Sequence, residues 1–93
     1  MIKCFLVSGR VQGVGFRFWV LRRVADIAGI SGYVCNLADG NVLVLASGSE
    51  TSLLKLKSSL YDGPLLARVD NVCETPENIS YFPEIKEGVF KRL

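Results

Sequence analysis

Apolar residues along this chain change twice from a short, nearly continuous run to a helical spacing, and this order leaves few folds possible. The short apolar runs predict four strands, over residues 2–8, 32–37, 41–46 and 67–74. Between them, two stretches repeat apolar residues every three or four positions and predict helices with one buried face. The order β-α-β-β-α-β predicts an α+β fold, a ferredoxin-like α/β sandwich. Its four- to five-stranded antiparallel sheet would carry both helices on one face.

The ends of the two predicted helices are marked by residues that start or stop helices. The apolar stripe of the first is Phe16, Trp19, Val20, Val24, Ile27 and Ala28. Gly29 is placed to end this helix in the left-handed conformation. Ser49 is the predicted N-cap of the second. Its buried side would comprise Leu53, Leu54, Leu56 and Leu60, with Lys55 and Lys57 facing water and Asp62-Gly63-Pro64 ending the helix.

Two further features complete the predicted sheet. Asp39-Gly40 lies between two strands and predicts a hairpin turn, because both residues tolerate a positive φ. Tyr81 to Lys86 predicts a short fifth strand, which Pro83 confines to a sheet edge because proline has no N–H group to donate.

The length of 93 residues predicts one domain, 1–93. A net charge of +2 is far weaker than the clustered basic surface of a nucleic-acid binder, so no nucleic-acid partner is expected. No apolar run approaches the roughly 18 residues of a membrane span. The first residues also lack the pattern of a signal peptide, so a cytoplasmic location is expected.

Three cysteines, Cys4, Cys35 and Cys73, stand far apart, and the chain has no histidine. Without a C-x-x-C pair or histidine ligands, no zinc site is expected. Reduced thiols packed as small hydrophobic groups are the favoured interpretation. A disulfide between Cys4 and Cys73, on neighbouring strands, stays open as the alternative.

The segment from Gly9 to Gly15 joins the first strand to the first helix and contains a third glycine, Gly13. N–H groups at a helix start lack partners and carry partial positive charge, and a glycine-rich turn lets several of them converge on an anion. Arg17 adds a planar guanidinium suited to phosphate oxygens. The segment is neither G-x-G-x-x-G nor a Walker motif. The alternative is that these glycines only turn the chain and Arg17 is solvated.

The residues of this segment, Gly9-Arg10-Val11-Gln12-Gly13-Val14-Gly15-Phe16-Arg17, resemble the first signature of the acylphosphatase family. Gly32-Tyr33-Val34-Cys35-Asn36, followed by Asp39-Gly40, Val42 and Gly48, is similar to the second. Gly63-Pro64 and Ala67-Arg68-Val69 are similar to the stretch that enters the family's fourth strand. The resemblance covers nearly the whole chain.

This resemblance implies hydrolysis of acyl phosphates to a carboxylate and inorganic phosphate, without a cofactor or a metal ion. It assigns phosphate binding to Arg17 and the positioning of the attacking water to Asn36. The phosphate-binding amides would be those of Val11, Gln12, Gly13, Val14, Gly15 and Phe16. A monomer is expected, with inorganic phosphate as product inhibitor.

The chemistry agrees with so sparse a site. A carboxylate leaving group has a conjugate acid of pKa about 4, so it needs no general acid at neutral pH. Phosphoryl transfer asks the protein mainly for positioning and charge stabilisation. An asparagine amide cannot act as a base, but its oxygen accepts a hydrogen bond from water. By residue type alone, Asn36 would more often bond to the turn at Asp39-Gly40.

The sequence departs from the family pattern in two places. Cys35 occupies a position that is usually polar or basic, and its thiol is expected to point away from the site. The C-terminal stretch contains Pro83, and the tail from Gly88 to Leu93 runs past the expected end of the last strand.

Three alternatives remain. The first is an acylphosphatase-like domain of a large hydrogenase-maturation carbamoyltransferase, which Val34-Cys35-Asn36 also resembles; ending at residue 93 favours a free-standing enzyme. The second is an RNA-recognition module, disfavoured because residues 41–46 lack the stacking aromatic residues of that fold. The third is a small-ligand regulatory module, which would usually dimerise.

Overall fold

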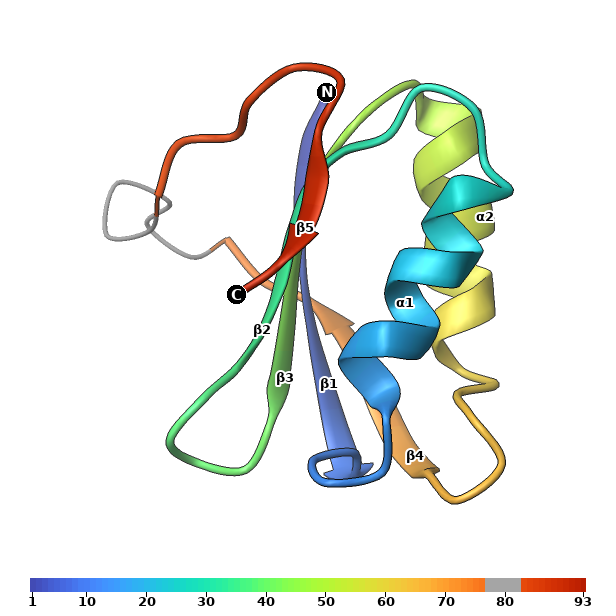
Figure 1. Ribbon diagram of the computed structural model, residues 1–93, viewed down its shortest axis with the longest axis vertical. Coiled ribbons are helices and arrows are strands. Elements are labelled where there is room, and N and C mark those ends of the chain that lie inside the picture. Colours follow the sequence, from blue (N-terminus) through green and yellow to red (C-terminus); the bar gives the residue numbers. More distant parts are fainter. Residues whose placement is uncertain (77–82) are drawn as a thin grey trace.

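The computed structural model describes residues 1–76 and 83–93 and contains a single sheet with two helices. The elements are β1 (Ile2–Arg10), α1 (Phe16–Ala25), β2 (Ser31–Asn36), β3 (Val42–Ser47), α2 (Glu50–Leu60), β4 (Arg68–Glu74) and β5 (Phe90–Arg92). The strand order is β4-β1-β3-β2-β5. Both helices lie on the same face of the sheet (Figure 1). The predicted element order and the ferredoxin-like α+β fold are confirmed.

The fifth strand differs from the prediction. Tyr81 and Phe82 lie outside the described residues, and residues 83–86 belong to no strand. The tail forms β5 instead, parallel to β2 with Phe90 opposite Gly32, so the sheet is mixed rather than wholly antiparallel. Two features favour this pairing. Pro83 has no N–H for a ladder, and the half-buried Phe90 packs against the core beneath the helices.

The main core lies between the sheet and the helices. From α1 it takes Phe16, Val20 and Val24, and from α2 Leu53, Leu56 and Leu60. Four predicted core positions differ: Trp19 and Ile27 are half-buried, whereas Ala28 and Leu54 are exposed. Ser49 caps α2 as predicted, its Oγ accepting a hydrogen bond from the Ser52 amide at 3.1 Å.

Helix α1 ends at Ala25, earlier than Gly29. The N–H of Ile27 bonds to the carbonyl of Val24, three residues back, so the last turn tightens out of α geometry. Gly29 does adopt a positive φ of 73°, but in the connection to β2. The apolar stripe therefore continued beyond the helix that it predicted.

The opposite face of the sheet carries a smaller apolar cluster of Cys4, Tyr33, Leu43 and Leu45. The hydroxyl of Tyr33 donates to the carbonyl of Pro83 at 2.8 Å. No disulfide joins Cys4 to Cys73: Cys4 is buried and Cys73 is exposed. The register places Cys73 opposite Leu6, two residues beyond Cys4. Cys4 is therefore an unbridged, packed thiol, as predicted. Cys73 is also unbridged, but it lies at the surface instead of being packed.

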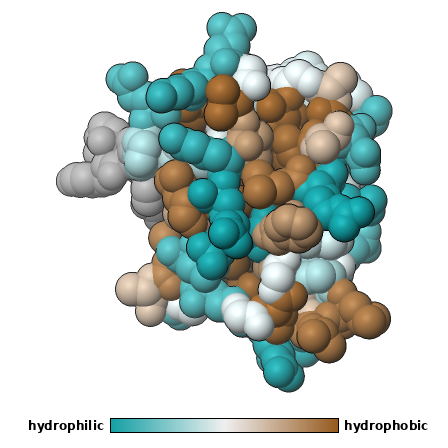
Figure 2. Space-filling model, viewed as in Figure 1, coloured by the Kyte–Doolittle hydropathy of each residue, from teal (hydrophilic) through white to brown (hydrophobic). Residues whose placement is uncertain are grey.

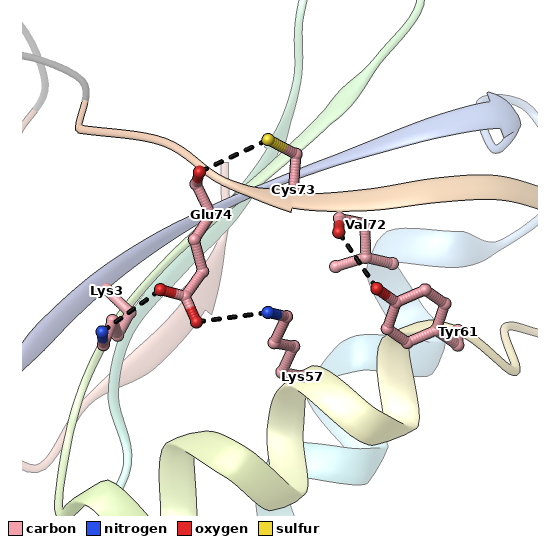
Figure 3. A network of polar contacts seen from close by, with 6 residues as sticks. All are labelled: Lys3, Lys57, Tyr61, Val72, Cys73 and Glu74. Carbon is pink, nitrogen blue, oxygen red and sulfur yellow. Dashed lines mark hydrogen bonds and ion pairs between the residues drawn. The ribbon is translucent and has the colours of Figure 1, made fainter.

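Charged side chains fasten the outer strand β4 to its neighbours (Figure 3). Glu74 accepts hydrogen bonds from Lys3 of β1 at 3.2 Å and from Lys57 of α2 at 3.3 Å. These two bonds hold the pKa of Glu74 below its usual range, so the carboxylate is ionised at neutral pH. Nearby, the hydroxyl of Tyr61 donates to the carbonyl of Val72 at 3.2 Å, joining α2 to β4.

Candidate active site

The turn between β1 and α1 is shaped by two glycines in the left-handed region. Gly13 has φ 73° and Gly15, the N-cap of α1, has φ 80°. A Cβ at either position would meet no atom within 4 Å, so backbone conformation rather than space requires glycine there. Since Gly15 has no side chain, no cap bond is made to the N–H groups of the first turn, which also holds no acidic residue. These groups stay available to an anion.

A cavity of about 190 Å³ opens at this turn. Its lining comprises Val11, Gly13, Gly15, Phe16, Arg17, Phe18, Asn36 and Arg92. Six of the eight predicted site residues therefore line the same cavity. Asn36 is one of them, although it belongs to β2, which follows α1 in the sequence. No acidic residue belongs to the lining, and two guanidinium groups do. The cavity is suited to a compact anion.

Arg17 lies in the first turn of α1 and is half-buried. Its Nη1 donates to the backbone carbonyl of Leu93 at 2.8 Å, just beyond β5. A guanidinium carries five N–H donors, so this bond uses one of them and leaves further donors for a phosphate. The amide of Leu93 in turn donates to the carbonyl of Val34 in β2, which ties the tail to the strand that ends at Asn36.

Asn36 is the last residue of β2, and it is exposed. The turn that follows is closed by Asp39, whose carboxylate accepts a hydrogen bond from the Asn41 amide at 3.0 Å. The turn-bonding alternative for Asn36 is therefore wrong, since Asp39 performs that task. Asn36 lines the cavity instead.

Gln12 and Val14, the other two predicted residues, do not line the cavity. The side chain of Val14 packs against the core. The Nε2 of Gln12 donates to the carbonyl of Leu37 at 2.7 Å and to that of Asn41 at 2.9 Å. Gln12 therefore joins the glycine turn to the β2–β3 hairpin, and so holds the turn against the strand that carries Asn36.

We expect Gln12→Glu to destabilise the protein and lower its activity. Glutamate has the same shape, but its carboxylate cannot donate, so two carbonyl groups would face a negative charge. Loss of such bonds costs about 1–3 kcal/mol. Thermal unfolding and turnover should therefore both decline, with Gln12→Ala showing a milder loss. A Gln12→Glu variant as stable and as active as wild type would contradict this role.

The cavity includes two residues that were not predicted, Phe18 and Arg92. A signal existed for Phe18, because it is an apolar residue that falls off the apolar stripe of α1. Arg92 could not be assigned, since the prediction placed the last strand before it. Its position follows from the parallel pairing of β5 with β2, in which Arg92 lies opposite Val34.

Cys35 precedes Asn36, but it packs on the opposite face of the sheet, next to the cluster around Tyr33. The prediction that its thiol points away from the site is confirmed. Burial raises the pKa of Cys35, and the positive charge of Arg17 only partly opposes this effect. The thiol is therefore protonated at neutral pH and is a poor nucleophile.

A larger hollow of about 690 Å³ lies at the other end of the sheet, beside Met1, Ile27 and Ile30. Its lining includes Glu87 and no arginine or lysine. It therefore offers no guanidinium or lysine side chain to a phosphate. Among the described residues, no helix is long and apolar enough to cross a membrane.

Comparison with known proteins agrees with this geometry. The acylphosphatase family model matches residues 3–84. An acylphosphatase of Koribacter versatilis is 53% identical over 68 residues, an alignment that covers 73% of this chain and 61% of that protein. One of Archaeoglobus fulgidus is 54% identical over 66 residues, covering 71% of this chain and 73% of the relative.

Solved structures are similar over the whole chain. The acylphosphatase of Bacillus subtilis superposes with a TM-score of 0.79 at 29% identity, covering 100% of this chain and 99% of that one. HypF of T. kodakarensis superposes with a TM-score of 0.76 at 31% identity, but this chain covers only 12% of it.

The fold is a ferredoxin-like sandwich with a cavity at the start of its first helix, and this chain belongs to the acylphosphatase family. Membership of this family also gives the enzyme class. Acylphosphatases are hydrolases that act on the acid anhydride between a carboxyl group and a phosphate.

Proposed function

We propose that this chain hydrolyses acyl phosphates in the cavity between the glycine turn and β2, with Arg17 binding the phosphate and Asn36 holding the attacking water. One observation carries the proposal: Arg17, Asn36 and the start of α1 line the same small cavity. The amides of residues 11–16 would supply further hydrogen bonds to the phosphate oxygens.

In this reaction, the oxygen of a water molecule forms a bond to phosphorus while the bond from phosphorus to the carboxyl oxygen breaks. The electron pair of the broken bond leaves with the carboxylate. The carboxamide oxygen of Asn36 accepts one hydrogen bond from the water and so aims its lone pair at phosphorus. The second proton of the bond-forming water passes to a phosphate oxygen of the substrate.

The protein's part is therefore electrostatic. Negative charge spreads over the phosphoryl oxygens in the transition state, where preorganised amides and a guanidinium stabilise it without reorganisation. The departing carboxylate is a weak base and needs no proton. This explains how a chain without histidine performs the reaction, and it requires no cofactor.

Hydrolysis of benzoyl phosphate in ¹⁸O-labelled water tests this proposal. Turnover above the buffer rate is expected, with the label in inorganic phosphate, because water attacks phosphorus. Label in benzoate would mean attack at the carbonyl carbon and would refute the assigned geometry. A protein that does not exceed the buffer rate would refute the function.

Three further properties belong to the same proposal. Inorganic phosphate is a competitive inhibitor, since it satisfies the same amides and guanidinium as the substrate. The chain acts as a monomer, because the cavity is complete within one chain. It acts in the cytoplasm on a small substrate and binds no nucleic acid, in line with its net charge of +2.

The match to HypF supports a second candidate, in which this chain is an acylphosphatase-like domain of a longer protein. The same assay separates the two. A free-standing enzyme turns over benzoyl phosphate by itself, whereas a domain that serves a larger protein is expected to bind phosphate without such turnover.

A further inference from the structure

Phe18 is an aromatic side chain that stands at the edge of the cavity and is 57% exposed. It follows Arg17 in the first turn of α1. Phe16, which lies two residues earlier and on the apolar stripe, is only 1% exposed and packs in the core. Packing of the fold therefore does not require an aromatic residue at position 18.

The surface continues from the cavity into a second, wider hollow of about 600 Å³. Gly15 and Phe18 line both spaces, whereas Trp19 and Pro64 line only the second. Figure 2 shows an apolar patch at the lower right of this face, where the segment between α2 and β4 lies. Phe18 thus stands at the boundary between a polar cavity and an open, partly apolar surface.

Of the two aromatic rings on this surface, that of Trp19 is already engaged. The guanidinium of Arg23 lies 5.4 Å from the centre of the Trp19 ring, and the Phe16 ring packs against Trp19 in a tilted arrangement at a centroid distance of 5.6 Å. The ring of Phe18 has no such contact among the described residues. It is the aromatic surface open to a ligand.

The substrate has two unlike halves. Its phosphate matches the amides and guanidinium groups of the small cavity, so its acyl group must extend outward through the mouth. A small acyl group, such as acetyl, would end near the mouth. An aromatic or bulky apolar acyl group would reach the ring of Phe18 and remove apolar surface of both partners from water.

We propose that Phe18 binds the acyl group of the substrate, and that this chain prefers acyl phosphates with an aromatic or bulky apolar acyl group. The inference rests on the proposed function, because it places the phosphate in the cavity. Phe18 is then a specificity-determining residue, which alters the choice of acyl group and leaves phosphate binding to Arg17.

The test compares kcat/KM for benzoyl phosphate and acetyl phosphate, which share the phosphate and differ in the acyl group. Phe18→Ala should lower the benzoyl-to-acetyl ratio about fivefold, because the stacking surface is lost. Phe18→Tyr, which keeps the ring, should retain the wild-type ratio. Leu54→Ala is the matched control, since Leu54 is 59% exposed on α2 and does not line either space.

Each outcome decides one point. A ratio unchanged in Phe18→Ala, or lowered equally in Leu54→Ala, would overturn the role of Phe18 while the wild type still hydrolyses both substrates. A wild type that hydrolyses neither substrate would overturn the proposed function itself. The inhibition constant of inorganic phosphate should stay near the wild-type value in Phe18→Ala, and a large rise would show that the residue acts on the phosphate instead.

Discussion

Replacing Arg17 with alanine should reduce kcat/KM for benzoyl phosphate by about a thousandfold or more, because an arginine that neutralises a transferring phosphoryl group contributes on that scale. Inhibition by inorganic phosphate should weaken in parallel, since the same guanidinium holds product and substrate. Steady-state kinetics with phosphate as inhibitor measure both effects.

Two further variants test whether the effect is specific to the guanidinium of Arg17. Arg17→Lys keeps the charge but loses the planar pair of donors, so it should also be severely impaired. Lys55→Ala removes one positive charge from an exposed site on α2 and should leave the kinetics unchanged. Near-normal turnover in Arg17→Lys would show that charge alone suffices, and normal phosphate inhibition in Arg17→Ala would remove Arg17 from the phosphate site.

Asn36→Ala should lower kcat by about a hundredfold or more, the scale observed when a single preorganised hydrogen-bonding group is removed from a reaction centre. The inhibition constant of inorganic phosphate should change little, because the proposed partner of Asn36 is water. Since Asn36 is exposed at the end of β2, its loss should not alter thermal unfolding.

The separation between kcat and phosphate affinity is the decisive readout for Asn36. Arg17 variants are expected to lose both, and Asn36 variants only the first. Equal loss of turnover and phosphate affinity in Asn36→Ala would mean that the carboxamide binds phosphate rather than water.

Local chemistry explains why most of the fold could be predicted. The alternation of strand and helix patterns, the Ser49 cap and the Asp39-Gly40 turn each depend on residues close in sequence. The glycine turn was equally predictable, because its positive φ values require glycine. These signals located the start of α1 and, with the family resemblance, Arg17 and Asn36.

Long-range pairing explains what could not be predicted. The tail runs past the end of the predicted last strand, and only its parallel pairing with β2 brings Arg92 to the cavity and the Leu93 carbonyl to Arg17. Likewise, nothing in residues 9–17 indicates that Gln12 bonds to the distant hairpin. Such contacts depend on which strands become neighbours in the sheet, and the pattern of residues along the chain does not show which strands pair.

The charged side chains of β4 have a consequence for behaviour at high protein concentration. β4 is one border of the sheet, and its exposed side chains include the Arg68–Asp70 pair and Glu74, which pairs with Lys3 and Lys57. A second copy that tried to add a strand there would have to bury these charges. The opposite border, β5, has only three residues and offers little backbone for such an addition. Both borders therefore resist intermolecular sheet growth, a common route from a small β-rich domain to fibrils.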